Sequence, residues 1–114
     1  MIKEPAIYLR HIVDSINSIE KYLQGVTEKQ FYASEEKQDS VSRRIEIIGE
    51  ATKNIADDFK KQHPDIPWKE MSAMRNILIH EYDDVDSSIT WDTATQHLPP
   101  LKKQVQKMLT EQAS

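Results

Sequence analysis

Apolar residues recur at intervals of three and four along most of the chain, the spacing that places them on one face of an α-helix. The first such stripe follows Pro5, a residue suited to a first helical turn, and stops at Gly25, a natural helix terminator. The stripe consists of Ile12, Ile16, Ile19 and Leu23. This pattern predicts a first helix that buries one face.

A second, shorter helix is predicted to start after Thr27. Thr27 followed by Gln30 has the form of a capping box, in which each side chain accepts a hydrogen bond from the backbone N–H of the other. We expect this helix to carry Phe31 and Tyr32 inward. The polar residues 34–40 can form either a bend or the start of another helix.

The most regular helical pattern extends over residues 38–62. Its apolar face is formed by Val41, Ile45, Ile48, Ile55 and Phe59. Gly49 lies inside the pattern, where glycine costs about 1 kcal/mol relative to alanine. We expect close packing of another backbone at Gly49 to offset this cost, and we regard the approach of a ligand as the second explanation.

Prolines 64 and 67 separate the long pattern from a third helix, and Trp68 is expected to dock this turn onto the core. The third helix is predicted to end near His80, because the acidic residues that follow are disfavoured at a helix C-terminus. Its buried stripe consists of Met71, Met74, Ile77 and Leu78.

A fourth helix can be capped by Ser87 or Ser88 and contains Ile89 and Trp91. The proline pair at 99 and 100 must kink or restart it, since proline lacks the backbone N–H that an inner helical turn needs. The last stripe consists of Leu101, Val105, Met108 and Leu109. No segment alternates as a strand would, so the expected fold is an all-α, up-and-down bundle of four to five helices.

Composition agrees with this expectation. The 114 residues suit a single domain over residues 1–114, and only two glycines are present, fewer than a sheet with tight turns usually needs. Cysteine is absent, which excludes disulfides and thiolate metal sites. The sequence has neither a signal-peptide pattern nor an apolar run of about 20 residues, so we expect a soluble, cytoplasmic protein. The net charge is −4, so the surface as a whole does not attract nucleic acid. If RNA is the ligand, it must be held by local basic residues.

Candidate chemistry is concentrated in residues 75–82. Arg75 carries a permanent cation whose donors match phosphate oxygens, and His80 can transfer protons near neutral pH. On an ideal helix the two are separated by about 140° and about 7.5 Å of rise, so they do not share a face. If both act on one phosphate, either the helix loosens at His80 or two copies of the chain complete the site.

A plainer interpretation of these residues is structural. Arg75 then forms a surface ion pair with a carboxylate, His80 helps to cap the helix, and Tyr82 packs at the rim. The nearby acidic segment is read as a solvated loop, because it lacks the glycine and distal glutamate of a calcium site. This segment contains Glu81, Asp83, Asp84 and Asp86. We expect no metal site, and read His11, His63 and His97 as structural or surface residues.

The chain resembles the HepT-like branch of the HEPN superfamily, small helical bundles that act as ribonuclease toxins in toxin–antitoxin pairs. The resemblance begins with Arg75, Asn76, three apolar residues, His80, Glu81 and Tyr82, which match the family's motif of arginine, four residues, histidine, one residue and tyrosine. Residues 43–51, Pro67-Trp68, residues 84–86 and Trp91 extend it in the family's order.

This resemblance implies metal-independent RNA cleavage by a homodimer, without a cofactor, at a cleft shared by two protomers. His80 fits the role of general base or general acid, Arg75 would stabilise charge on the phosphate, and Asn76 would orient either group. In the family, a minimal nucleotidyltransferase antitoxin, MntA, silences the toxin by adding AMP to the motif tyrosine. That acceptor corresponds to Tyr82.

Two other functions are compatible with the residues. A non-catalytic helical adaptor would keep the fold and use the motif only to bind a nucleotidyltransferase partner or nucleic acid, and the acidic net charge favours it. The presence of both Arg75 and His80 argues against an inactive enzyme. A nucleotide-binding domain that uses Arg75 on phosphate is weaker, because the sequence has no glycine-rich loop.

Overall fold

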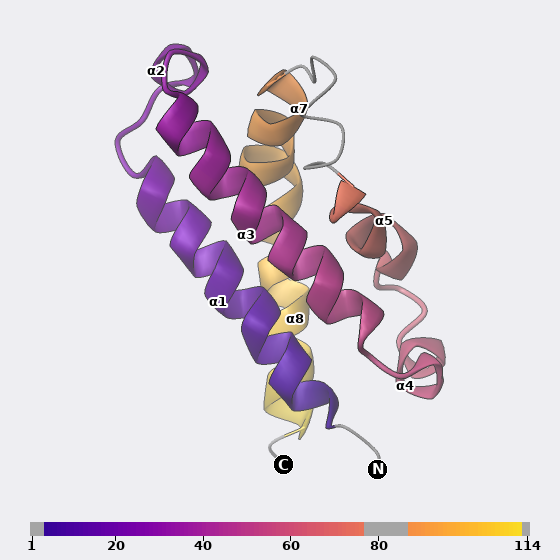
Figure 1. Ribbon diagram of the computed structural model, residues 1–114. Helices are drawn as coiled ribbons and strands as arrows, with labels where there is room; N and C mark the ends of the chain where they lie inside the picture. Colours follow the sequence, from indigo (N-terminus) through magenta and orange to yellow (C-terminus); the bar gives the residue numbers. More distant parts are fainter. Residues whose placement is uncertain (1–3, 77–86, 113–114) are drawn as a thin grey trace.

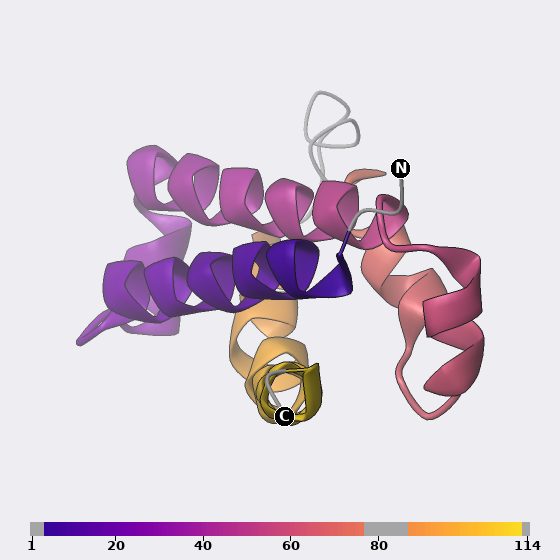
Figure 2. The same cartoon turned by 90° about the horizontal axis from the view of Figure 1, so that it is seen from below.

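The computed structural model describes residues 4–76 and 87–112, and all regular structure in these ranges is helical. Helices α1 (Pro5–Leu23) and α3 (Glu35–Lys53) lie side by side and run in opposite directions, joined through the short helix α2 (Glu28–Tyr32) (Figures 1 and 2). Helix α8 (Leu98–Gln112) packs against α1. These three long helices form the frame of the molecule.

Shorter helices complete the bundle. Helix α4 (Asp57–Gln62) lies at the turn after α3, and α5 (Trp68–Ala73) returns along α3 and packs on it (Figure 1). Helix α7 (Ser87–Asp92) continues through the π-helical turn η1 (Thr93–His97) into α8. The direction of the chain alternates through α1, α3, α5 and the α7–α8 column. The expected all-α, up-and-down arrangement is confirmed, although the described helical segments outnumber the four to five that we predicted.

The first two helices follow the predicted signals closely. Gly25, which follows the C-cap residue of α1, adopts a φ of 73°. The capping box is present, since the Thr27 N–H donates to Gln30 Oε1 at 3.0 Å and the Gln30 N–H donates to Thr27 Oγ1 at 3.1 Å. Phe31 is fully buried, but the prediction for Tyr32 was wrong, because this side chain is exposed. Neighbouring helical residues point about 100° apart, so only one of this pair can face the core.

The helix predicted over residues 38–62 is two helices. It starts earlier, at Glu35, where the Ser34 side chain accepts from the Lys37 N–H at 3.2 Å, and α3 then ends at Lys53. The Asn54 side chain donates to Glu50 O at 2.9 Å, and its own N–H donates to Ala51 O, which tightens the last turn. The predicted apolar stripe is buried on both sides of the break, so its periodicity did not reveal the interruption.

The proline pair at 99 and 100 restarts the helix through a π turn. Prolines at these positions supply no N–H to the carbonyls one turn earlier. In η1, immediately before them, the Leu98 N–H donates to Thr93 O, five residues back. The Thr95 side chain also donates to Trp91 O at 2.8 Å. The hydrogen bonds thus change from a four-residue to a five-residue spacing just before the prolines, and the chain continues as α8.

The hydrophobic core lies between α1, α3 and the α7–α8 column. Its fully enclosed side chains include Leu9, Ile12, Phe31, Val41, Ile45, Ile48, Met71, Leu98 and Val105. Trp91 packs on Phe31 with ring centroids 5.4 Å apart, whereas Ile89 is 53% exposed and does not belong to the core. None of the helices in the described ranges combines the length and apolar character that a membrane span needs.

Trp68 docks the turn between α4 and α5 onto the core, as predicted. Its indole N–H donates to His63 O at 2.9 Å, and its ring meets Phe59 edge-on at 6.3 Å. Met71 is buried and Met74 packs against the core from outside. Helix α5 ends at Ala73, so the predicted third helix is interrupted before Arg75. The remainder of its predicted stripe, Ile77 and Leu78, lies outside the described residues.

Candidate functional site

Arg75 is seated on α3 by a direct backbone contact. It follows α5 in a turn, in which the Met74 N–H donates to Met71 O at 3.2 Å. A Cβ atom built on Gly49 would lie 2.5 Å from the backbone N of Arg75, and 3.0 Å and 3.1 Å from its Cβ and Cα atoms. A side chain at position 49 is therefore incompatible with this packing. The prediction that another backbone packs against Gly49 is confirmed.

Glu50, the next residue of α3, pairs with the side chain of Arg75. Its Oε1 atom lies 3.5 Å from Arg75 Nε, and the Arg75 and Glu50 side chains are 36% and 51% exposed. The ion pair is the contact that the structural interpretation of Arg75 predicted. Because both groups remain partly solvated, such a pair contributes only about 0.2–1 kcal/mol. The guanidinium therefore remains accessible to a stronger anion.

A second cation lies on the same face of α3. Arg43 is exposed and precedes Glu50 by two helical turns, about 10.5 Å along the helix axis. Arg44, beside it, is half-buried. Arg43 and the Arg75–Glu50 ion pair therefore lie along one side of this helix, together with the carboxylate of Glu46.

The remaining predicted site residues are placed only in part. Asn76 directly follows Arg75 and is exposed. His80 and Tyr82 lie outside the described residues, as does the acidic segment of residues 81–86. The structure therefore places Arg75, the first residue of the motif, against residues 43–51 of α3. The resemblance had identified the motif and residues 43–51 as separate segments.

The other histidines make local contacts. His63 stacks on Phe59 with ring centroids 4.6 Å apart, and His11 meets Tyr8 edge-on at 6.1 Å. His97 is exposed on η1. Within residues 4–76 and 87–112, no three His, Cys, Asp or Glu side chains come together in a way that could hold a metal ion.

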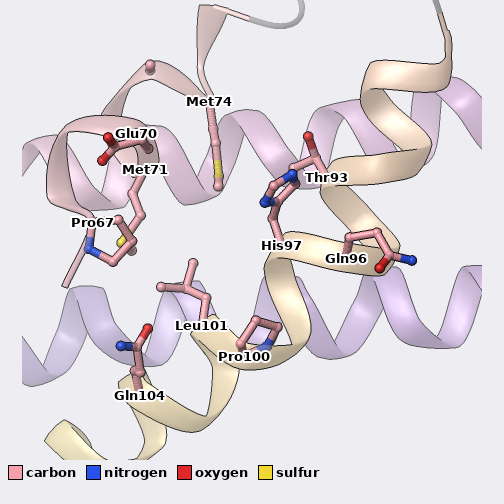
Figure 3. A pocket seen from close by; sticks show the side chains of 11 residues that line it. Pro67, Glu70, Met71, Met74, Thr93, Gln96, His97, Pro100, Leu101 and Gln104 are labelled. Carbon is pink, nitrogen blue, oxygen red and sulfur yellow. The ribbon is translucent and has the colours of Figure 1, made fainter. Parts of the chain in front are cut away.

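Sequence reasoning missed a groove of about 480 Å³ between α5 and the η1–α8 segment (Figure 3). Its lining is largely apolar, with amide and imidazole groups added by glutamine and histidine side chains. The lining residues include Met71, Met74, Gln96, His97, Leu101 and Gln104. Met74 points into this groove, whereas Arg75, one residue later, contacts α3. In the sequence this region was marked only by the proline pair, of which Pro100 lines the groove.

Sequence reasoning also assigned no role to Glu50, although it is part of the segment that carried the resemblance. Its pairing with Arg75 depends on α5 returning along α3, which no local pattern encodes. Fold and geometry together define a class of protein: an all-α bundle with a partly exposed arginine seated at a glycine of a neighbouring helix.

Comparison with known proteins identifies the family. Residues 12–108 match the family model described as "Ribonuclease HepT-like", and the chain belongs to this family. It is 43% identical over 101 residues to the "Probable ribonuclease HepT" of Thermococcus cleftensis, covering 89% of this chain and 92% of that protein. No solved structure matches the chain significantly.

A second relative is longer than this chain. The "Gamma-glutamylcyclotransferase and putative RNase" of Methanocaldococcus jannaschii is 46% identical over 111 residues, which cover 97% of this chain. The match spans only 50% of that relative, so this chain corresponds to about half of its length.

Proposed function

We propose that this protein is an endoribonuclease that cleaves RNA without a metal ion, with Arg75 binding the phosphate at the cleavage site. The observation that carries the proposal is the accessible Arg75 side chain, whose backbone is fixed at Gly49 in a chain of the HepT-like ribonuclease family. A guanidinium at a defined position stabilises the negative charge that develops on phosphate oxygens during cleavage. Arg43 offers a second contact to the RNA backbone.

His80 supplies the proton transfer in this proposal. As general base it removes the proton of a ribose 2′-hydroxyl, whose oxygen attacks the adjacent phosphorus. As general acid it protonates the leaving oxygen. Asn76, next to Arg75 and exposed, orients one of the reacting groups by hydrogen bonding. On an ideal helix a five-residue separation would put Arg75 and His80 on different faces, so we propose that two protomers share one cleft and together supply both residues.

Control by a partner enzyme is the second part of the proposal. A minimal nucleotidyltransferase antitoxin adds AMP to Tyr82, two residues from His80. The added nucleotide fills the cleft and its phosphate repels the RNA backbone, so cleavage stops. Coexpression with such a nucleotidyltransferase and intact-mass measurement would detect the added AMP. An unmodified Tyr82 in the presence of an active partner enzyme would contradict this mode of control.

Cleavage is tested with a fluorophore–quencher single-stranded RNA in buffer that contains EDTA. We expect the wild-type chain to cleave it, and Arg75→Ala and His80→Ala variants, purified in parallel, to lose at least about a hundredfold in rate. Glu20→Gln is the matched control, because it breaks a different ion pair, with Lys102, on the α1–α8 side. Equal rates in wild type and His80→Ala would show that the activity is not that of this site.

A non-catalytic adaptor is the second candidate, favoured by the net charge of −4 and by the Glu50 carboxylate beside Arg75. An adaptor would bind a nucleotidyltransferase partner or RNA without cleaving either. Binding by the wild-type chain, unchanged in His80→Ala and unaccompanied by cleavage, would support this function over the ribonuclease.

A further inference from the structure

We propose that Gly49 and Glu50 act together as positioning residues for Arg75, one for its backbone and the other for its guanidinium. This inference rests on the proposed ribonuclease function and extends it to the residues that aim the phosphate-binding group. Both residues belong to α3, which the sequence places far from the motif. Neither is proposed to touch the substrate.

The helix that carries these two residues is packed into the core where they lie. Ile45, one turn before Gly49, and Ile48, directly before it, are completely buried, and the Thr52 side chain donates to Ile48 O at 2.8 Å. A group that is held by such a packed element keeps its position better than one on a loop. Gly49 and Glu50 therefore provide a fixed reference for a residue that follows the end of a short helix.

The contact with Gly49 fixes the position of the Arg75 backbone, from which the side chain extends. With no side chain on Gly49, the Arg75 backbone nitrogen approaches to a distance at which an alanine Cβ would overlap it, at 2.5 Å. Its Cα and Cβ atoms are also close to the same point, so translation toward α3 is blocked and the origin of the side chain is defined. This accounts for a glycine inside an otherwise regular helix.

The ion pair sets where the guanidinium points. The ion pair joins Glu50 Oε1 to Arg75 Nε at 3.5 Å. A carboxylate beside Nε leaves the outer edge of the guanidinium free, where each terminal NH₂ group presents one N–H in parallel to two phosphate oxygens. Glu50 thus selects the rotamers of Arg75 in which the two terminal NH₂ groups face an anion.

A different role for Glu50 leads to the opposite kinetic result. If Glu50 were only a competing anion that occupies Arg75 until RNA displaces it, its removal would lower KM and leave kcat unchanged. If it positions Arg75 for the transition state, its removal lowers kcat, because misplacement of a catalytic group affects the reacting geometry more than substrate binding. The division between kcat and KM therefore distinguishes the two roles.

The experiment compares Glu50→Ala and Glu50→Gln with wild type and with Glu20→Gln in the EDTA-containing RNA cleavage assay. We expect Glu50→Ala to lower kcat about tenfold with KM changed less than about twofold. Glu50→Gln keeps an oxygen that can accept from Arg75 Nε, so it should recover part of the loss, to within about threefold of wild type. Glu20→Gln, with the same change in charge, should match wild type.

The outcomes separate this inference from the proposed function. Wild-type kcat in a folded Glu50→Ala protein, together with an inactive Arg75→Ala protein, would overturn positioning by Glu50 and leave the ribonuclease intact. Equal cleavage by wild type and Arg75→Ala would instead reject the ribonuclease site. If Glu50→Ala fails to fold, Glu50→Gln decides, because it keeps the size of the side chain. A wild-type kcat with a lowered KM in this variant would assign Glu50 as a competitor.

Discussion

Replacement of Gly49 by alanine tests the packing that seats Arg75. The new Cβ would lie 2.5 Å from the Arg75 nitrogen, whereas ordinary contacts begin at 3.4 Å, so the two backbones must separate by about 0.9 Å, the difference of these distances. Three backbone-proximal atoms of Arg75 line this point, and none is the free end of a flexible side chain. The end of α5 must therefore move away from α3.

The energetic consequence has two opposing parts. Alanine improves the helix propensity of α3 by about 1 kcal/mol. Overpacking of a close contact costs about 1–3 kcal/mol. We expect a net loss of about 1 kcal/mol in the free energy of unfolding, which corresponds to a melting temperature lower by about 4 °C for a chain of this size. Circular dichroism at the helical band measures this shift.

The kinetic consequence is larger than the loss of stability. A displacement close to 1 Å moves the guanidinium out of its productive position, so we expect kcat for RNA cleavage to fall by at least about tenfold. Gly25→Ala is the matched control. Gly25 has a φ of 73°, and a Cβ atom at this position would have nothing within 4 Å, so alanine there costs about 1 kcal/mol of backbone strain without touching Arg75.

The two glycine variants should thus lose similar stability, and only Gly49→Ala should lose activity. A Gly49→Ala protein that melts at or above the wild-type temperature with unchanged kcat would refute the argument that this glycine is required by the Arg75 backbone.

Three further predictions concern the cap, the core and the shared cleft. Thr27→Ala removes the capping box and should destabilise the protein by about 1 kcal/mol in urea unfolding; an unchanged midpoint would mean that the cap contributes nothing. Leu98 is fully buried, so Leu98→Ala should lower the free energy of unfolding by about 2–5 kcal/mol, whereas Ile89→Ala, at an exposed position, should lower it by less than about 0.5 kcal/mol. Similar losses in the two variants would contradict this difference in burial. Equal amounts of Arg75→Ala and His80→Ala protein, after subunit exchange, should regain about a quarter of wild-type cleavage if each site takes one residue from each protomer; no recovery would place both residues in one chain.

Several features were predictable from the sequence because their causes are local. The capping box joins residues three apart, and the stripe of α1 depends on neighbours one turn away. Gly25 adopts the left-handed conformation that only the absence of a side chain makes easy. The apolar stripes also identified most of the core, since helical periodicity decides which residues share a face.

Other features depended on contacts that periodicity cannot describe. The apolar stripe is continuous through the break after α3, so only the local hydrogen bonds of Asn54 reveal it. Tyr32 and Ile89 are apolar enough for the core, but the packing of α2 and α7 leaves them exposed. The sequence predicted that the proline pair would kink or restart the helix, but it did not predict the π turn of η1 that precedes the pair.

For the candidate site, the residue types and their spacing were enough to indicate the chemistry: an arginine, an asparagine, a histidine and a tyrosine in a short motif, and a glycine that needed an explanation. The tertiary structure was needed to show that the Arg75 backbone packs against Gly49 and that Glu50 forms an ion pair with Arg75. Residues far apart in sequence meet because α5 folds back along α3, and that path is set by the burial of Met71 and the docking of Trp68 rather than by any pattern within the motif.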